Sequence, residues 1–162
     1  MFFHGWDGAL RNHMSGALWA RANAWITLAT PIILKELPID SKNRAYILNS
    51  LREQIAALAE FQRADGSFGT LLDFEHSYSD TSAAVGFSAG IKMAYEMGLI
   101  DESYLQTANK AYHYVVSKID KKGNVTGVST GTPIMETKED YLNISVSQTL
   151  YGQGLALFML CS

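Results

Sequence analysis

The segment at residues 82–97 constrains the fold more than any other part of the chain, because as a helix it would have almost no polar face. Its first half is dominated by small and apolar residues: Ala83, Ala84, Val85, Gly86, Phe87, Ala89 and Gly90. A helix that is apolar on all sides must be buried. The sequence therefore predicts a buried helix that packs closely against neighbours on several sides.

Two further segments are rich in small and apolar residues. Residues 15–34 carry apolar side chains at three- and four-residue spacing, with Ser15 as the expected N-cap and Pro31 as the expected end or kink of the helix. Residues 147–160 combine Gly152 and Gly154 with large apolar side chains. We therefore expect a helix in each of these segments.

Two amphipathic segments alternate with these three. Residues 41–63 place Ile47, Leu51, Ile55 and Leu58 on one stripe, and residues 101–119 begin at an acidic pair. The three apolar segments begin at intervals of roughly 65 residues. This alternation predicts an all-α fold of about five main helices, arranged as the inner and outer rings of a partial (α/α)6 toroid. An ordinary five-helix globular bundle fits the periodicity equally well.

The composition limits the class of protein. The 162 residues fit one domain, and 48% hydrophobic against 18% charged residues is typical of a globular chain. Because 13 Lys and Arg face 16 Asp and Glu, the basic excess of nucleic-acid-binding proteins is missing. No apolar run reaches the roughly 20 residues of a membrane span. We therefore expect neither a nucleic acid nor a membrane as partner.

Cysteine usage and the first residues bear on the compartment. Cys161 is the single cysteine, which excludes an internal disulfide and a cysteine-based zinc site. The chain does not begin with the basic and apolar pattern of a secretory signal. The expected location is the bacterial cytoplasm.

A group of aromatic and basic residues predicts a binding site. Trp19 and Trp25 flank Arg21, and His4 lies shortly upstream. Tryptophan faces stack on pyranose rings, and a guanidinium offers two parallel donors to a carboxylate. This inventory is typical of a pocket for an acidic sugar. Core packing of one tryptophan, a solvated or salt-bridged arginine and fraying near residue 4 are the competing interpretations.

Two loops contain polar side chains that chemistry could use. The first holds Asp73, Glu75, His76, Tyr78 and Asp80, without the fixed spacing of a metal motif. We expect a solvated loop that ends in a helix N-cap at Asp80. The second, residues 126–132, is rich in Ser, Thr and Gly but lacks the lysine of a phosphate loop, which favours a surface loop. We expect no metal and no cofactor.

Four motifs in a common order resemble the unsaturated rhamnogalacturonyl hydrolases, of the glycoside hydrolase family 105 type. They are His4-Gly5-Trp6-Asp7, the Trp-x-Arg-x-Asn-x-Trp element at 19–25, Tyr78-x-Asp80-Thr81-Ser82-Ala83-Ala84, and Tyr151-Gly152-Gln153-Gly154-Leu155-Ala156-Leu157. The related unsaturated glucuronyl hydrolases share a similar tryptophan-arginine-tryptophan element. The sequence departs from the pattern at Ala22 and Ala24, where glycine is frequent, and at Asp80, where glutamate is common.

The resemblance implies a six-hairpin (α/α)6 toroid of about twice this length, of which residues 1–162 would be a single domain forming the C-terminal half. It also implies removal of an unsaturated uronic acid from pectin fragments. In that reaction an aspartic acid protonates the sugar double bond, water adds to the neighbouring carbon, and the hemiketal opens. The resemblance puts this aspartate in the N-terminal half, so the catalytic residue is unassigned here. Asp7, the nearest carboxyl group in sequence, is not given that role.

The resemblance assigns binding roles to four residues. Arg21 would bind the sugar carboxylate or a hydroxyl, Trp19 and Trp25 would stack on the ring, and His4 would hydrogen-bond the ring or orient water. The oligosaccharide is then the expected partner. A non-catalytic carbohydrate-binding or self-associating half-toroid is the alternative function. Since half a toroid exposes the flanks of buried helices, we expect self-association or pairing with an N-terminal half.

Overall fold

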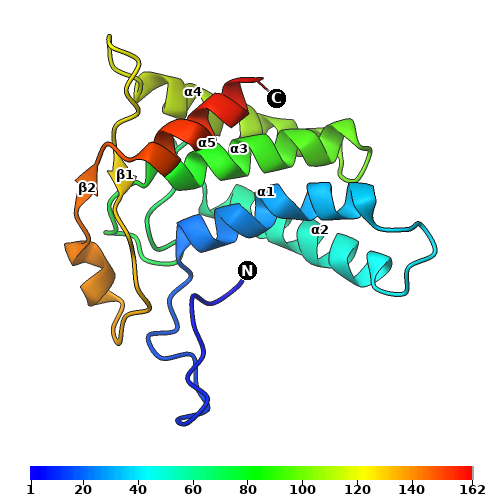
Figure 1. The fold of residues 1–162 in the computed structure, drawn as a ribbon, viewed down its shortest axis with the longest axis horizontal. Helices are drawn as coiled ribbons and strands as arrows, with labels where there is room; N and C mark the ends of the chain where they lie inside the picture. Colours follow the sequence, from blue (N-terminus) through cyan, green and yellow to red (C-terminus); the bar gives the residue numbers. More distant parts are fainter. Residues whose placement is uncertain (162) are drawn as a thin grey trace.

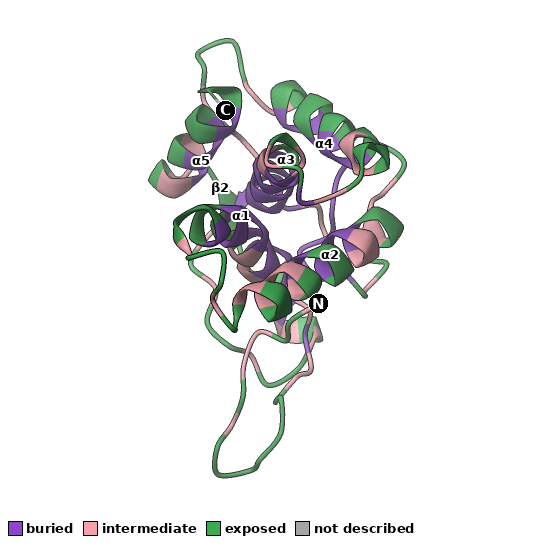
Figure 2. Ribbon diagram, turned by 90° about the vertical axis from the view of Figure 1, so that its right-hand side faces the viewer, coloured by how far each residue is buried: buried purple, intermediate pink, exposed green. Residues whose placement is uncertain are grey.

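The computed structural model describes residues 1–161, and five α-helices form its two layers (Figure 1). Helices α1 (Ala20–Glu36), α3 (Thr81–Glu96) and α5 (Leu150–Cys161) run in the same direction, with α3 between the other two. Helices α2 (Arg44–Phe61) and α4 (Leu105–Ser117) cover them from one side (Figure 2). The predicted alternation of apolar and amphipathic helices is therefore confirmed as two layers.

The remaining elements are short. The 3-10 helix η1 (Glu102–Tyr104) directly precedes α4, and the 3-10 helix η2 (Glu139–Asn143) lies in the polar stretch between α4 and α5. Strands β1 (Val128–Ser129) and β2 (Val146–Ser147) pair antiparallel, with Val128 opposite Ser147. No helix among residues 1–161 is long and apolar enough to cross a membrane.

Helix α3 is the buried centre of the domain, as predicted. Its residues are buried from Thr81 to Ile91 without interruption. Two glycines let α1 approach it closely. A Cβ atom at Gly86 would lie 2.9 Å from the Cβ of Ala24, and one at Gly90 would lie 2.5 Å from the carbonyl oxygen of Thr27. The two helix backbones therefore pack at a distance that other residues at these positions would prevent.

Of the end or kink expected at Pro31, the end is not observed, because α1 continues to Glu36. Proline has no N–H to donate to the carbonyl of Thr27, one turn earlier. That carbonyl faces the space left by Gly90. The hydroxyls of Thr27 and Thr30 also donate to carbonyls of the preceding turn, at 2.9 and 2.6 Å. Close packing on α3 thus accommodates the proline within the helix.

The expected N-cap at Ser15 is also wrong, because α1 begins at Ala20 with Trp19 at the N-cap. Met14 and Gly16 have φ of 55° and 61°, in the left-handed region that helices do not use. The amide of Ala20 instead donates to the carbonyl of Thr70 at 2.9 Å. Trp19 thereby has an extended backbone that pairs with Leu71 just before the helix.

The amphipathic helices follow the sequence more closely. Leu51, Ile55 and Leu58 are buried on the predicted stripe of α2. The predicted acidic start of the fourth helical segment is confirmed, since the Asp101 side chain accepts from the amide of Ser103 at 2.9 Å. Capping by an aspartate is a local interaction, which explains why the sequence predicts it well.

We predict that Gly90→Ala destabilises the domain by about 2 to 4 kcal/mol, since the new Cβ would collide with the carbonyl of Thr27. Gly154→Ala on α5 is the matched control, because nothing lies within 4 Å of a Cβ built there. It should leave stability unchanged or raise it by up to about 1 kcal/mol. Urea unfolding followed by circular dichroism measures both. Equal effects of the two substitutions would contradict this account of the helix contact.

Candidate functional site

A cavity of about 360 Å³ lies where α1 and α5 begin. Six residues line it: Trp19, Arg21, Trp25, Gly131, Thr132 and Tyr151. Three of the four predicted binding residues are therefore neighbours in space, and residues 131 and 132 close the cavity from the segment that follows β1. None of the six lining residues carries a carboxyl group.

Arg21 is 4% exposed, and its guanidinium is held by hydrogen bonds from both terminal nitrogens. One nitrogen donates to the carbonyl of Ser129 at 2.5 Å and to the hydroxyl of Tyr151 at 2.8 Å. The other donates to the carbonyl of Thr130 at 2.6 Å and to the hydroxyl of Thr132 at 3.1 Å. The four terminal N–H groups, which the sequence analysis assigns to the substrate, thus already have partners in the chain.

The guanidinium also lies between two aromatic rings. Its central carbon is 4.8 Å from the ring centre of Trp19 and 4.8 Å from that of Tyr151. Both contacts are favourable cation–π geometry. Within residues 1–161, Arg21 has no carboxylate within ion-pair distance, since the ion pair there joins Lys138 to Asp73. A buried, unpaired positive charge therefore sits in the wall of the cavity.

Asp80 holds the other side of the segment that Arg21 binds. It caps α3 by accepting from the amide and the hydroxyl of Ser82, at 3.0 and 2.6 Å. Its second oxygen accepts from the hydroxyl of Ser129 at 2.6 Å. The predicted capping role is confirmed, but Asp80 is fully buried rather than the end of a solvated loop. Ser129 thus donates its hydroxyl to Asp80 and accepts at its carbonyl from Arg21.

The expectation of a surface loop at residues 126–132 is wrong at its centre. Val128 and Ser129 are fully buried. The hydroxyl of Tyr151 also donates to the carbonyl of Ser129, so α1, α3 and α5 all bind this one residue. Composition alone suggested exposure because it cannot show that Ser and Thr side chains have buried partners elsewhere in the fold.

Trp19 and Trp25 differ in their surroundings, as the six-residue spacing predicts. Trp19 is 8% exposed, and its indole nitrogen has no hydrogen-bond partner among residues 1–161. Trp25 is 45% exposed and lines the same cavity. The first ring is packed as a wall of the core, and the second is free to contact a ligand.

His4, the fourth predicted binding residue, is not among the residues that line the cavity and packs against Trp19. Its ring centre is 4.2 Å from that of Trp19, and its Nδ1 is 2.6 Å from the hydroxyl of Tyr141. Partial burial, and secondarily the positive charge of Arg21, lower the pKa of His4 below its usual 6.5. The backbone amide of His4 donates to the carbonyl of Ala17 at 2.9 Å, which fixes the residue in place.

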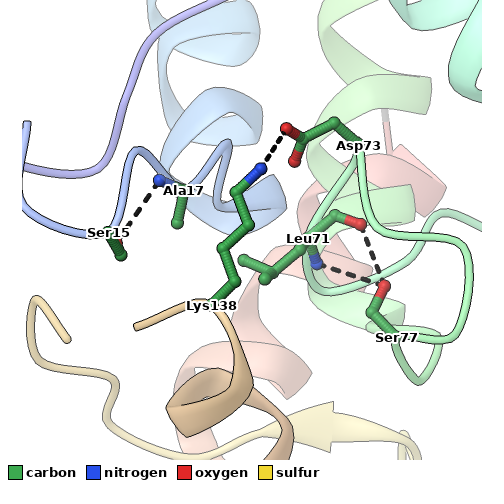
Figure 3. Close-up of polar contacts among 6 residues, drawn as sticks. All are labelled: Ser15, Ala17, Leu71, Asp73, Ser77 and Lys138. Atoms are coloured by element: carbon green, nitrogen blue, oxygen red, sulfur yellow. Dashed lines mark hydrogen bonds and ion pairs between the residues drawn. The ribbon is translucent and has the colours of Figure 1, made fainter. Parts of the chain in front are cut away.

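Polar contacts tie the loop at residues 71–77 to the segment that precedes Tyr141 and hold that loop in shape (Figure 3). The ammonium group of Lys138 lies 2.6 Å from a carboxylate oxygen of Asp73. The hydroxyl of Ser77 donates to the carbonyl of Leu71 at 2.9 Å. Asp73 thus has a structural partner. Residues 1–161 contain no group of three His, Cys, Asp or Glu side chains arranged to hold a metal ion.

Three other polar residues lie outside the cavity. Asp7 accepts from the amides of Ala9 and Leu10, both at 2.8 Å, and so forms a turn. His13 packs against the rings of Phe3 and Trp6. His113 is exposed on α4. Sequence reasoning gave no role to Tyr141, Tyr151 or Ser129, since their hydrogen bonds to His4 and Arg21 span more than 100 residues.

The comparisons with known proteins agree with this architecture. The model of the family described as Glycosyl Hydrolase Family 88 matches residues 1–162. The chain is 32% identical over 161 residues to the unsaturated rhamnogalacturonyl hydrolase YesR of Bacillus subtilis (strain 168), covering 99% of this chain and 45% of that protein.

Solved structures add the fold. A possible member of the GH105 family from Salmonella enterica superposes with a TM-score of 0.95 and 36% identity, over 99% of this chain and 43% of that one. A possible member of the same family from Klebsiella pneumoniae superposes with a TM-score of 0.94 and 36% identity. The match covers 99% of this chain and 42% of that one. The chain thus spans less than half the length of these relatives. The predicted fold class, part of an (α/α)6 toroid, is confirmed.

We predict that Arg21→Met destabilises the domain by about 3 kcal/mol, since it removes the charged donors of the Ser129 and Thr130 carbonyls and leaves each with one hydroxyl donor. Arg21→Lys should destabilise the domain less than Arg21→Met does, because an ammonium keeps the positive charge. It should still destabilise the domain, because an ammonium cannot serve four acceptors in one plane. Lys122→Met on an exposed turn is the control, with an expected change within about 0.5 kcal/mol. Chemical unfolding measures all three. An Arg21→Met protein as stable as the control would refute the structural role of the guanidinium.

Proposed function

The chain belongs to Glycosyl Hydrolase Family 88, and we propose that it forms the substrate-binding part of a glycoside hydrolase that acts on unsaturated uronic-acid-terminated pectin oligosaccharides. The observation that carries the proposal is the buried Arg21, which faces a cavity lined by two tryptophans without a carboxylate partner. A site of this kind favours a ligand that combines a flat apolar face with a negative charge.

Each predicted binding residue keeps a role in this proposal. Trp25 stacks on the sugar ring from its exposed position, and Trp19 forms the fixed wall behind it. Arg21 attracts the carboxylate through its field and offers direct contact only if a sugar oxygen replaces one of its internal acceptors. His4 donates a hydrogen bond to the sugar. These roles extend the family relationship to the individual residues of this chain.

The chemistry requires a proton donor that the cavity itself does not supply. Hydration of the conjugated double bond begins with protonation by a carboxylic acid, which needs a pKa near the working pH. No lining residue is an aspartate or a glutamate. We therefore expect the 162-residue chain to bind the sugar without consuming it. The acid would then come from a part of the hydrolase outside these 162 residues.

Calorimetric titration of the chain with an unsaturated rhamnogalacturonyl disaccharide tests the proposal. We expect binding that weakens about tenfold or more in Trp25→Ala, because an exposed stacking ring is lost. Trp6→Ala is the matched control, since Trp6 is 56% exposed and does not line the cavity. A neutral disaccharide of the same size should bind more weakly than the acidic one. Equal binding of both sugars, or equal loss in both variants, would contradict the proposed site.

The ultraviolet absorbance of the conjugated double bond, followed during the same titration, shows whether the sugar is consumed. Unchanged absorbance together with binding supports a binding part that depends on an acid from elsewhere. Decay of the absorbance that is lost in Trp25→Ala would instead make this chain, or its assembly, a complete hydrolase. Decay with unsaturated glucuronyl substrates only would shift the substrate assignment.

We also propose that two copies of the 162-residue chain associate through the outer helices of the parallel layer. The exposed apolar side chains there are Trp25, Ile32 and Ile33 on α1 and Leu157, Phe158 and Leu160 on α5. Both helices have one neighbour in this layer, α3, and an open edge (Figure 2). Since one chain spans 43% of a related structure, two copies supply nearly as much chain as one relative.

Light scattering at micromolar concentration measures this association. We expect a dimer or a larger species, because apolar faces of this extent drive association in water. Leu157→Glu should shift the population toward monomer, whereas Leu10→Glu, at a residue 70% exposed on the N-terminal loop, should not. A well-behaved monomer of the unmodified chain would contradict the proposal. The expectation of a cytoplasmic protein stays a prediction.

A further inference from the structure

The contact between His4 and Tyr141 determines where the imidazole carries its proton. Tyr141 is fully buried, and its hydroxyl lies 2.6 Å from Nδ1 of His4. The same hydroxyl accepts a hydrogen bond from the backbone amide of Met135 at 3.3 Å. Counting the donors and acceptors around the Tyr141 hydroxyl therefore shows which protonation state of His4 satisfies them all.

A tyrosine hydroxyl has one proton to donate and two lone pairs. The amide of Met135 can only donate, so it occupies one lone pair. If Nδ1 of His4 were protonated, it would occupy the other, and the hydroxyl proton would have no acceptor among residues 1–161. A buried donor without a partner is costly. The alternative, in which the hydroxyl donates to an unprotonated Nδ1, satisfies every group.

We infer that Tyr141 is a positioning residue that holds His4 as the neutral imidazole with its proton on Nε2, ready to donate to a hydroxyl of the bound sugar. This step rests on the proposed function. Nε2 makes no hydrogen bond to another group in residues 1–161, and the His4 ring is partly exposed beside Trp19. The fixed tautomer turns an otherwise ambiguous ring into a donor of known direction.

The surrounding charges act in the same direction. An imidazolium would add a second positive charge near Arg21, which already lacks a carboxylate partner, and would leave the Tyr141 proton unsatisfied. The lowered pKa of His4 agrees with this geometry. The site thus combines one permanent cation with one neutral donor, rather than two cations.

Long-range proton–nitrogen correlation spectra of the ¹⁵N-labelled chain at pH 8 test the inference, with His4→Gln to assign the signals. We expect the Nδ1 resonance of His4 in the range of an unprotonated nitrogen and Nε2 in that of a protonated one. A protonated Nδ1, or the mixture of tautomers given by the exposed His113, would overturn it. The tautomer is read from the unmodified chain, and His4→Gln serves only to assign the signals.

Tyr141→Phe tests the cause, with Tyr46→Phe as the matched control because Tyr46 is 77% exposed on α2. Loss of the hydroxyl should remove the tautomer preference and raise the pKa of His4, because the neutral imidazole loses a hydrogen bond that favours it. The control should leave both unchanged. A folded Tyr141→Phe protein that keeps the tautomer and the pKa would overturn the role of Tyr141.

Adding the unsaturated disaccharide separates this inference from the proposed function. If calorimetry detects binding, the Nε2 proton resonance of His4 should move, and a resonance that stays in place would overturn its role as donor. If calorimetry detects no binding, the proposed function fails. The tautomer measured without sugar remains a separate result, which supports or overturns the role of Tyr141 by itself.

Discussion

The hydrogen bonds on Ser129 are the interaction on which the rest of this structure depends. Arg21 from α1 and Tyr151 from α5 donate to its carbonyl, and Asp80 at the start of α3 accepts from its hydroxyl. The beginnings of three helices are thereby fixed relative to one another by a single buried residue. Since a buried charge is tolerated only when its hydrogen bonds are satisfied, Arg21 and Asp80 each stabilise the segment that satisfies them.

The helical framework could be predicted because it follows from local rules. A helix with no polar face has to be buried, and α3 lies at the centre of the domain. An aspartate that precedes a helix can cap it, as Asp80 and Asp101 do. The errors at Pro31 and Ser15 have tertiary causes. Pro31 is tolerated because Gly90 of another helix gives room to a carbonyl. The late start of α1 follows from positive φ angles at residues that have no glycine signature, such as Met14.

The candidate site divides in the same way. Trp19, Arg21 and Trp25 are close in sequence, so helical spacing was enough to bring them to one cavity. The partners of Arg21 and His4 are 108 to 137 residues away along the chain. The periodicity of the sequence cannot predict contacts between residues so far apart in the chain. The serine- and threonine-rich composition of residues 126–132 suggested that this segment is exposed. In the structure the terminal N–H groups of Arg21 bind its own chain, and the contact of Arg21 with a sugar carboxylate or hydroxyl stays a prediction.

The engagement of Arg21 with its own chain changes how an acidic sugar would be recognised. With its terminal N–H groups held internally, the guanidinium acts mainly through its charge, and burial protects that charge from the screening that weakens exposed pairs. The directional hydrogen bonds to the sugar would then come from groups that retain a free donor. The Nε2–H of a neutral His4 is one such donor. In this arrangement charge selects the uronic acid, Trp25 selects the ring, and Tyr141 sets the direction of the hydrogen bond. Arg21 would thus serve both the stability of the site and its selection of charge, whereas Trp25 and His4 would serve specificity alone.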